Sequence, residues 1–170
     1  MLDYLQNLAL ANWVRSSPSI FAYTSVLTAH AVGLAIVVGV NTVIGLRLLG
    51  VAKDIPLAGL RRLYGIVWVG FLINLVSGIL LFIAEAHNMA AMVAFWAKLV
   101  LVAIGMIVAE LLKRFYFTDL ASVQAGVVTR VGRNLAIISL GSWYLALIVG
   151  RLTGYPDLVS GWLGLSGGST

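Results

Sequence analysis

One long run without fixed charge, near the start of the chain, constrains the fold more than any other feature. From Ile20 to Leu46 there is no Asp, Glu, Lys or Arg, and the run lies between Pro18 and Gly50. About 20 apolar residues in an α-helix cross a bilayer core of about 30 Å. The run therefore predicts a membrane-spanning helix over residues 18–49, with Gly50 as its C-terminal glycine.

The rest of the chain has the same character. Its 170 residues are 61% hydrophobic and only 10% charged, whereas soluble domains are about 45–50% apolar and about 25% charged. Further apolar runs predict spans over residues 63–86, 90–114 and 133–154. We therefore expect a single-domain, all-α integral membrane protein, a four-helix bundle. The chain has no cysteine, which excludes disulfides, thiolate metal sites and covalent c-type haem attachment.

The residues before the first span show a helical pattern of their own. Apolar residues recur on one side of residues 1–17, and Asp3, Asn7 and Arg15 fall off that side. Such a pattern is typical of an interfacial amphipathic helix that lies on the membrane. A flexible N-terminus is the alternative.

Basic residues predict the orientation of the spans. Eight of them fall in or beside two loops on one side of the membrane, namely Arg47, Lys53, Arg61, Arg62, Lys113, Arg114, Arg130 and Arg133. The positive-inside rule places these loops in the cytoplasm and both termini outside, in the periplasm if the membrane is a bacterial inner membrane. Because the basic residues flank apolar runs, the net charge of +5 indicates a lipid bilayer as the partner and no nucleic acid.

The first span contains a stripe of polar residues. His30 lies about ten residues, or about 15 Å, into this span. Tyr23, Val37 and Asn41 fall on the same side, with Gly33 close to it. Since ionisable groups within a membrane tend to mark a site, His30 is a candidate ligand of haem iron or copper, or a proton-handling group. A hydrogen bond between helices is the alternative.

Two cations near the outer ends of spans are further candidates. Lys98 lies in the third span, and its ammonium either reaches the outer headgroups or pairs with an anionic ligand group or with Glu85. Arg151 ends the fourth span and either anchors it at the interface or binds a carboxylate. In the outer loop His87, Met89 and Met92 form H-x-M-x-x-M, imidazole and thioether groups that suit Cu(I). The alternative is that these are ordinary loop residues.

The second span carries small and polar residues at every fourth position, namely Gly70, Asn74 and Gly78. This spacing places all three on one face, where a neighbouring helix can approach closely. We therefore expect this face to pack against another span.

Five short segments together resemble a known type of protein: WVRSSPSIFAY at 13–23, AH at 29–30, GLRLLG at 45–50, FWAKL at 95–99 and SLGSWYLALIVGRLTGY at 139–155. They resemble a family of uncharacterised four-helix bacterial membrane proteins, distantly similar to copper-resistance-protein-D-like membrane domains. Gly45 stands where that family is expected to carry an acidic residue. The wider resemblance is to the haem-associated protoporphyrinogen oxidase of bacteria, and it implies that His30 is a haem ligand and that Lys98 matches a third-span lysine.

The leading hypothesis is a membrane protein that binds b-type haem or a related redox cofactor for electron transfer. His30 would be the ligand, with Lys98 and Arg151 near the propionates. One alternative is a non-catalytic subunit or scaffold that works with other membrane subunits or as a homo-oligomer. Another is copper handling on the periplasmic side. No catalytic signature stands out in the sequence, so the sequence leaves open whether the protein is an enzyme.

Overall fold

The structure, a computed structural model, describes Trp13 and residues 20–116 and 128–155. These residues form helices, with no strand among them. The helices are α3 (Ile20–Leu49), α4 (Leu57–Ala84), α5 (Ala86–Ala91), α6 (Val93–Tyr116) and α8 (Arg130–Leu152). All but α5 are long and apolar enough to cross a membrane. The chain is therefore a multi-pass membrane protein with the expected all-α architecture, a bundle of four long helices.

Two helix starts differ from the expected spans because a helix can begin before its hydrophobic segment does. Helix α4 begins at Leu57 rather than at residue 63, directly after the extended Pro56. Helix α8 begins at Arg130 rather than at residue 133, and its N-cap Thr129 accepts a hydrogen bond from the backbone N–H of Gly132. Both additional first turns carry arginine. Such polar turns extend from the hydrocarbon region toward water.

Two expected helix ends have clear local causes in the structure. Helix α3 ends where Gly50 takes φ +86°, a left-handed conformation that glycine adopts without steric cost. The third expected span, residues 90–114, is divided at Met92, whose extended backbone separates the short helix α5 from α6. The amphipathic helix expected over residues 1–17 lies outside the described residues except for Trp13, which is exposed. That helix stays a prediction.

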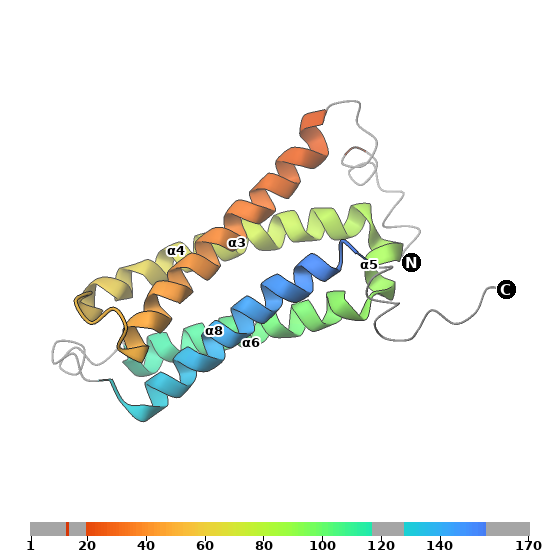
Figure 1. The fold of residues 1–170 in the computed structure, drawn as a ribbon. Helices are drawn as coiled ribbons and strands as arrows, with labels where there is room; N and C mark the ends of the chain where they lie inside the picture. The colour runs from red at the N-terminus through yellow and green to blue at the C-terminus, as the bar shows by residue number, and fades with distance from the viewer. Residues whose placement is uncertain (1–12, 14–19, 117–127, 156–170) are drawn as a thin grey trace.

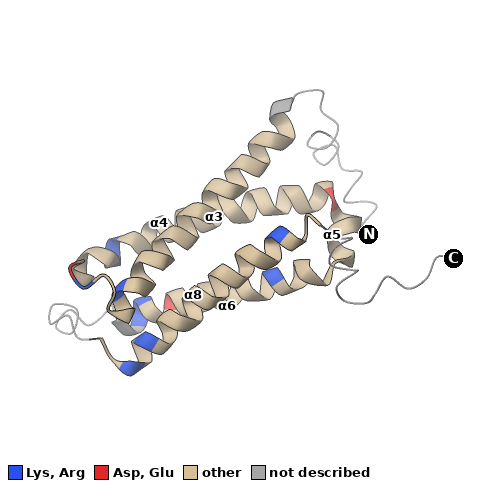
Figure 2. Cartoon of the chain, viewed as in Figure 1, with Lys and Arg blue, Asp and Glu red and all other residues tan. Residues whose placement is uncertain are grey.

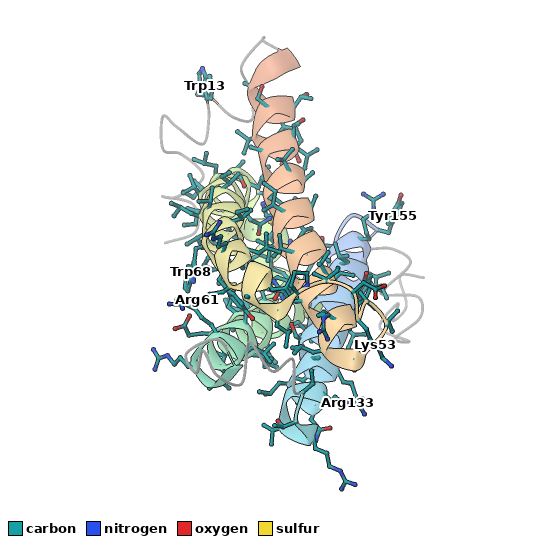
Figure 3. All side chains as sticks on the ribbon, turned by 90° about the vertical axis from the view of Figure 1, so that its left-hand side faces the viewer. Trp13, Lys53, Arg61, Trp68, Arg133 and Tyr155 are labelled. Atoms are coloured by element: carbon teal, nitrogen blue, oxygen red, sulfur yellow. The ribbon has the colours of Figure 1, made fainter. Side chains whose placement is uncertain are left out.

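The long helices pack as two pairs (Figure 1). Helix α3 packs against α4, and α6 packs against α8, while contacts between α3 and α8 join the pairs. Helices α4 and α6 have few close backbone approaches and meet through side chains instead. The first turns of α3 diverge from the other helices (Figures 1 and 3). Close backbone packing therefore joins α3 to α4, α6 to α8 and α3 to α8, whereas side chains fill the space between α4 and α6.

Glycines make the close approaches at these tight contacts. A Cβ atom on Gly33 would lie 2.7 Å from the backbone N of Asn74 and 2.7 Å from the backbone O of Gly70. The expected packing face of the second span is thereby confirmed, and its partner is α3. Gly45 plays a similar part between α3 and α8, because its Cβ would lie 2.8 Å from Leu140. Close packing thus explains why a glycine stands at position 45.

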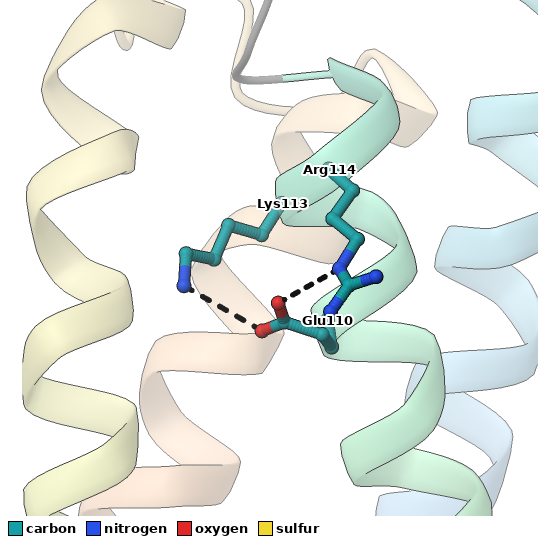
Figure 4. A network of polar contacts seen from close by, with 3 residues as sticks. All are labelled: Glu110, Lys113 and Arg114. Carbon is teal, nitrogen blue, oxygen red and sulfur yellow. Dashed lines mark hydrogen bonds and ion pairs between the residues drawn. The ribbon is translucent and has the colours of Figure 1, made fainter.

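Charge is distributed unevenly along the bundle. Most Lys and Arg residues gather at the end opposite α5 (Figure 2). Figure 3 views the bundle from that basic end, where Lys53, Arg61 and Arg133 are labelled. Also at this end, Glu110 pairs with Lys113 at 3.6 Å and with Arg114 at 3.1 Å (Figure 4). Glu110 is thus neutralised by its own helix.

Candidate functional site

A cavity of about 490 Å³ lies between α4 and α6, near the α5 end of the bundle. Its wall is largely aliphatic and aromatic, and the polar residues that line it are His30, Asn74, Lys98 and Thr153. Cavities that bind small molecules and cofactors have this size and this mixture of an apolar wall with a few polar groups. The cavity is therefore the candidate site.

The imidazole of His30 is held through one of its nitrogens. Nδ1 lies 3.1 Å from the backbone carbonyl of Asn74 and 3.1 Å from the hydroxyl of Ser77. The carbonyl can only accept, and the Ser77 hydroxyl already donates to the carbonyl of Ile73 at 2.7 Å. Nδ1 therefore carries the proton and donates, which leaves the lone pair of a neutral imidazole on Nε2.

The second nitrogen of His30 is the one left for a ligand. Within the part of the chain that the structure describes, Nε2 has no hydrogen-bond partner, and His30 lines the cavity. Gly78 gives the ring its space, because a Cβ at that position would lie 3.1 Å from Cε1. Metal-binding histidines commonly donate their other nitrogen to a carbonyl in this way, which fixes the tautomer and the ring orientation.

Helices α3 and α4 hold this histidine by a reciprocal pair of bonds. The side-chain amide of Asn74 donates to the backbone carbonyl of His30 at 2.9 Å, while the carbonyl of Asn74 accepts from the imidazole. The close approach at Gly33 and Gly70 lies beside this pair and brings the two backbones within reach. His30 therefore joins helices, as one interpretation expected, and still presents Nε2 to the cavity.

Lys98 reaches the same cavity from α6. Its stem packs over Gly150 of α8, with Cδ 3.4 Å and Nζ 3.7 Å from where a Cβ would stand. No described residue forms an ion pair or a hydrogen bond with Lys98; Glu85, one expected partner, instead accepts from Asn88. The ammonium is close enough to interact electrostatically with the imidazole of His30. The cavity thus combines an available imidazole with an available cation.

Three other expected residues do not line the cavity. Tyr23 lies on the diverging first turns of α3 and is 42% exposed. Asn41 is buried deeper in the bundle, where its side-chain amide donates to the carbonyl of Val37 on its own helix. Arg151 is exposed at the end of α8. The three polar residues expected on one side of the first span thus lie in three environments: Tyr23 is exposed, His30 lines the cavity and Asn41 is buried.

The three residues expected to bind copper also lie in different surroundings. Met89 lines the cavity, His87 is exposed on α5, and Met92 is the half-buried residue between α5 and α6. Among the described residues, no group of three or more His, Cys, Asp or Glu side chains could hold a metal ion. The outer loop therefore contributes one thioether to the cavity.

Several cavity residues were missed by the sequence reasoning. Phe82 and Phe95 stack with centroids 5.2 Å apart, and Trp96 meets Phe95 edge-on at 5.5 Å. Met106 adds a thioether from α6. Ser77 could have been found, because it lies on the same face of α4 as Asn74 and Gly78. The aromatic residues carried no such signal, since aromatic residues are common near membrane interfaces.

Comparisons of this chain with models of protein families, with curated proteins and with solved structures return no match.

Proposed function

We propose that the cavity binds a b-type haem, that Nε2 of His30 would hold its iron, and that the protein serves in electron transfer. The observation that carries the proposal is the state of His30. Its Nδ1 is bound by the carbonyl of Asn74, and its Nε2 is left available at an apolar cavity. Those are the features of a histidine prepared to bind a metal.

The other cavity residues fit the group. A macrocycle is planar and largely apolar, and the aromatic wall of Phe82, Phe95 and Trp96 offers it surfaces of the same kind. The propionates are carboxylates, for which Lys98 is the cation available among the cavity residues. When bound, haem supplies a one-electron iron couple. The chain's own residues would orient the macrocycle, exclude water and pair Lys98 with one of its carboxylates.

Two thioethers could help His30 to hold the iron. Met89 and Met106 line the cavity and carry thioethers, which serve as haem ligands in some cytochromes. His87, the other histidine of the chain, is exposed and does not line the cavity. An iron in the cavity would therefore be held by His30 alone or by His30 with a thioether.

The proposal includes a location. The basic end of the bundle, opposite α5, supports an orientation with that end in the cytoplasm. Both termini are then outside, and the cavity lies in the outer half of a bacterial inner membrane. This is the side on which a membrane protein meets periplasmic electron donors or acceptors.

Absorption spectra of the purified protein test the proposal. Wild-type protein from cells well supplied with haem should show a haem band that shifts on reduction, and His30→Ala should lose that band while remaining folded. The matched control is His87→Ala, which removes the exposed histidine and should keep the band. A colourless wild type would favour the alternative of a non-catalytic subunit or scaffold. Haem that persists in His30→Ala would exclude His30 as the ligand.

A further inference from the structure

The cavity has one open side. Of the residues that line it, those that are also exposed belong only to α4 and α6. The large ones are Leu75 and Ile79 on α4 and Trp96 and Leu99 on α6, each between 43% and 54% exposed. They form the rim of the cavity. Because both helices are membrane-spanning, this rim faces the acyl chains of the bilayer.

Side chains fill the cavity along the bundle axis. Toward α5 lie the stacked rings of Phe82 and Phe95 and the side chain of Met89, all half-buried. Toward the basic end, Phe71 and Met106 pack against the buried core. A ligand coming from water along the axis would have to displace these side chains.

The open side is also where the helix backbones approach each other least. Helices α4 and α6 have few close backbone approaches, whereas each packs extensively against its own partner, α3 or α8. Near the cavity α4 and α6 meet through side chains, such as the stacked rings of Phe82 and Phe95, so the gap can widen by side-chain movement without separating closely packed backbones. The contacts of α3 with α8 can hold the two pairs together meanwhile.

We infer that the ligand enters and leaves this cavity sideways, from the hydrocarbon region of the membrane, through the gap between α4 and α6. The ligand class is a lipid-dissolved, planar apolar molecule with an anionic group. Its apolar part meets the rim, and its anionic group reaches Lys98, whose ammonium lacks a partner of opposite charge among the described residues. The inference rests on the proposed function in taking haem as that ligand.

Closing the gap reversibly tests this route, and the absence of cysteine from the chain makes the design simple. The variant Leu75→Cys with Leu99→Cys places one thiol on each side of the rim. A flexible, cleavable thiol-specific reagent then joins α4 to α6. Purified protein in vesicles receives haem either dissolved in the bilayer or added to the water. The rate at which the haem band appears is the readout.

Joining the rim should slow uptake of bilayer-dissolved haem at least 10-fold, and cleavage of the reagent should restore the rate. The control variant, Thr42→Cys with Tyr144→Cys, joins α3 to α8 at a contact of 3.2 Å outside the cavity and should leave the rate unchanged. Ile79→Trp narrows the rim without a reagent and should also slow uptake.

Two results would overturn the lateral route: equal rates with the rim joined and free, or faster uptake from water than from the bilayer. Failure of the proposed function is distinguishable from both. In that case the untreated variant and the wild type take up no haem from either source.

Discussion

The contact between α3 and α4 makes a sharp prediction about two glycines on one helix. At Gly33 a Cβ would lie 2.7 Å from two backbone atoms of α4, whereas at Gly39 it would meet nothing within 4 Å. The substitutions Gly33→Ala and Gly39→Ala are chemically identical and lie on the same helix, α3. Gly33→Ala should nevertheless lower the free energy of unfolding, whereas Gly39→Ala should leave it unchanged or raise it.

The magnitude follows from the distances. Carbon atoms rest at about 3.5–4.0 Å from their neighbours, so the contacts of 2.7 Å at Gly33 require α3 and α4 to separate by about 0.8 Å. Backbone atoms cannot rotate away as a flexible side chain can. Overpacking of this kind costs about 1–3 kcal/mol, partly offset by about 0.5–1 kcal/mol from the higher helix propensity of alanine. Gly39→Ala retains only the favourable part.

Unfolding of the purified variants in mixed micelles, with increasing denaturing detergent, measures the difference. Gly33→Ala should be less stable than wild type by up to about 2.5 kcal/mol, and Gly39→Ala should be equal to wild type or more stable by up to about 1 kcal/mol. Gly33→Ala should also weaken haem binding, because separating the helices stretches the bond between Nδ1 of His30 and the carbonyl of Asn74. Equal stability of the two variants would refute the close approach.

Three further predictions concern other parts of the chain. A reporter active only in the cytoplasm, fused after Thr170, should be silent if both termini are outside, and strong activity would reverse the orientation. Ser77→Ala should lower the affinity for haem, measured by titration, about 10-fold, because it removes one partner of the His30 Nδ1. The control is Ser142→Ala, which should leave this affinity unchanged because the Ser142 hydroxyl donates to the carbonyl of Ile138 within α8. Glu110→Gln should change the free energy of unfolding by less than about 1 kcal/mol, since its ion pairs are exposed to water. A larger loss would mean that these pairs within α6 are shielded from water.

Much of this fold can be predicted from the sequence, because the membrane restricts which structures a chain can form. Every backbone polar group must be satisfied within the bilayer, so long apolar runs predict helices with little ambiguity. The spacing of Gly70, Asn74 and Gly78 identified a packing face, since glycine allows backbones to approach. The sequence could not show that α3 is the helix packed on that face. Periodicity describes one helix at a time and says nothing of where two helices cross.

The candidate site shows the same limit at the level of single side chains. His30 and Asn41 lie on one side of α3, and the sequence suggested a common environment for them. Asn41 instead donates to a carbonyl one turn earlier in its own helix, a bond that an intramembrane polar residue can form anywhere. His30 lies beside Gly78 and finds its partners on α4. Which partners each residue finds depends on the neighbouring helix. The sequence pattern of α3 carries no information about that helix.

The arrangement of the helix pairs gives the two polar residues of the cavity different supports. His30 belongs to the pair of α3 and α4. Its hydrogen bonds with Asn74 cross a contact at which the two helix backbones lie too close for a Cβ atom on Gly33. Lys98 belongs to the pair of α6 and α8, and its flexible stem lies over Gly150. A ligand that bound both residues would bridge pairs otherwise joined mainly by α3 and α8. Binding to the folded state alone stabilises it, by about 2.7 kcal/mol at 100 times the Kd. That stabilisation would act where the helix backbones approach each other least, so one gap between α4 and α6 can serve both for entry and for holding the ligand.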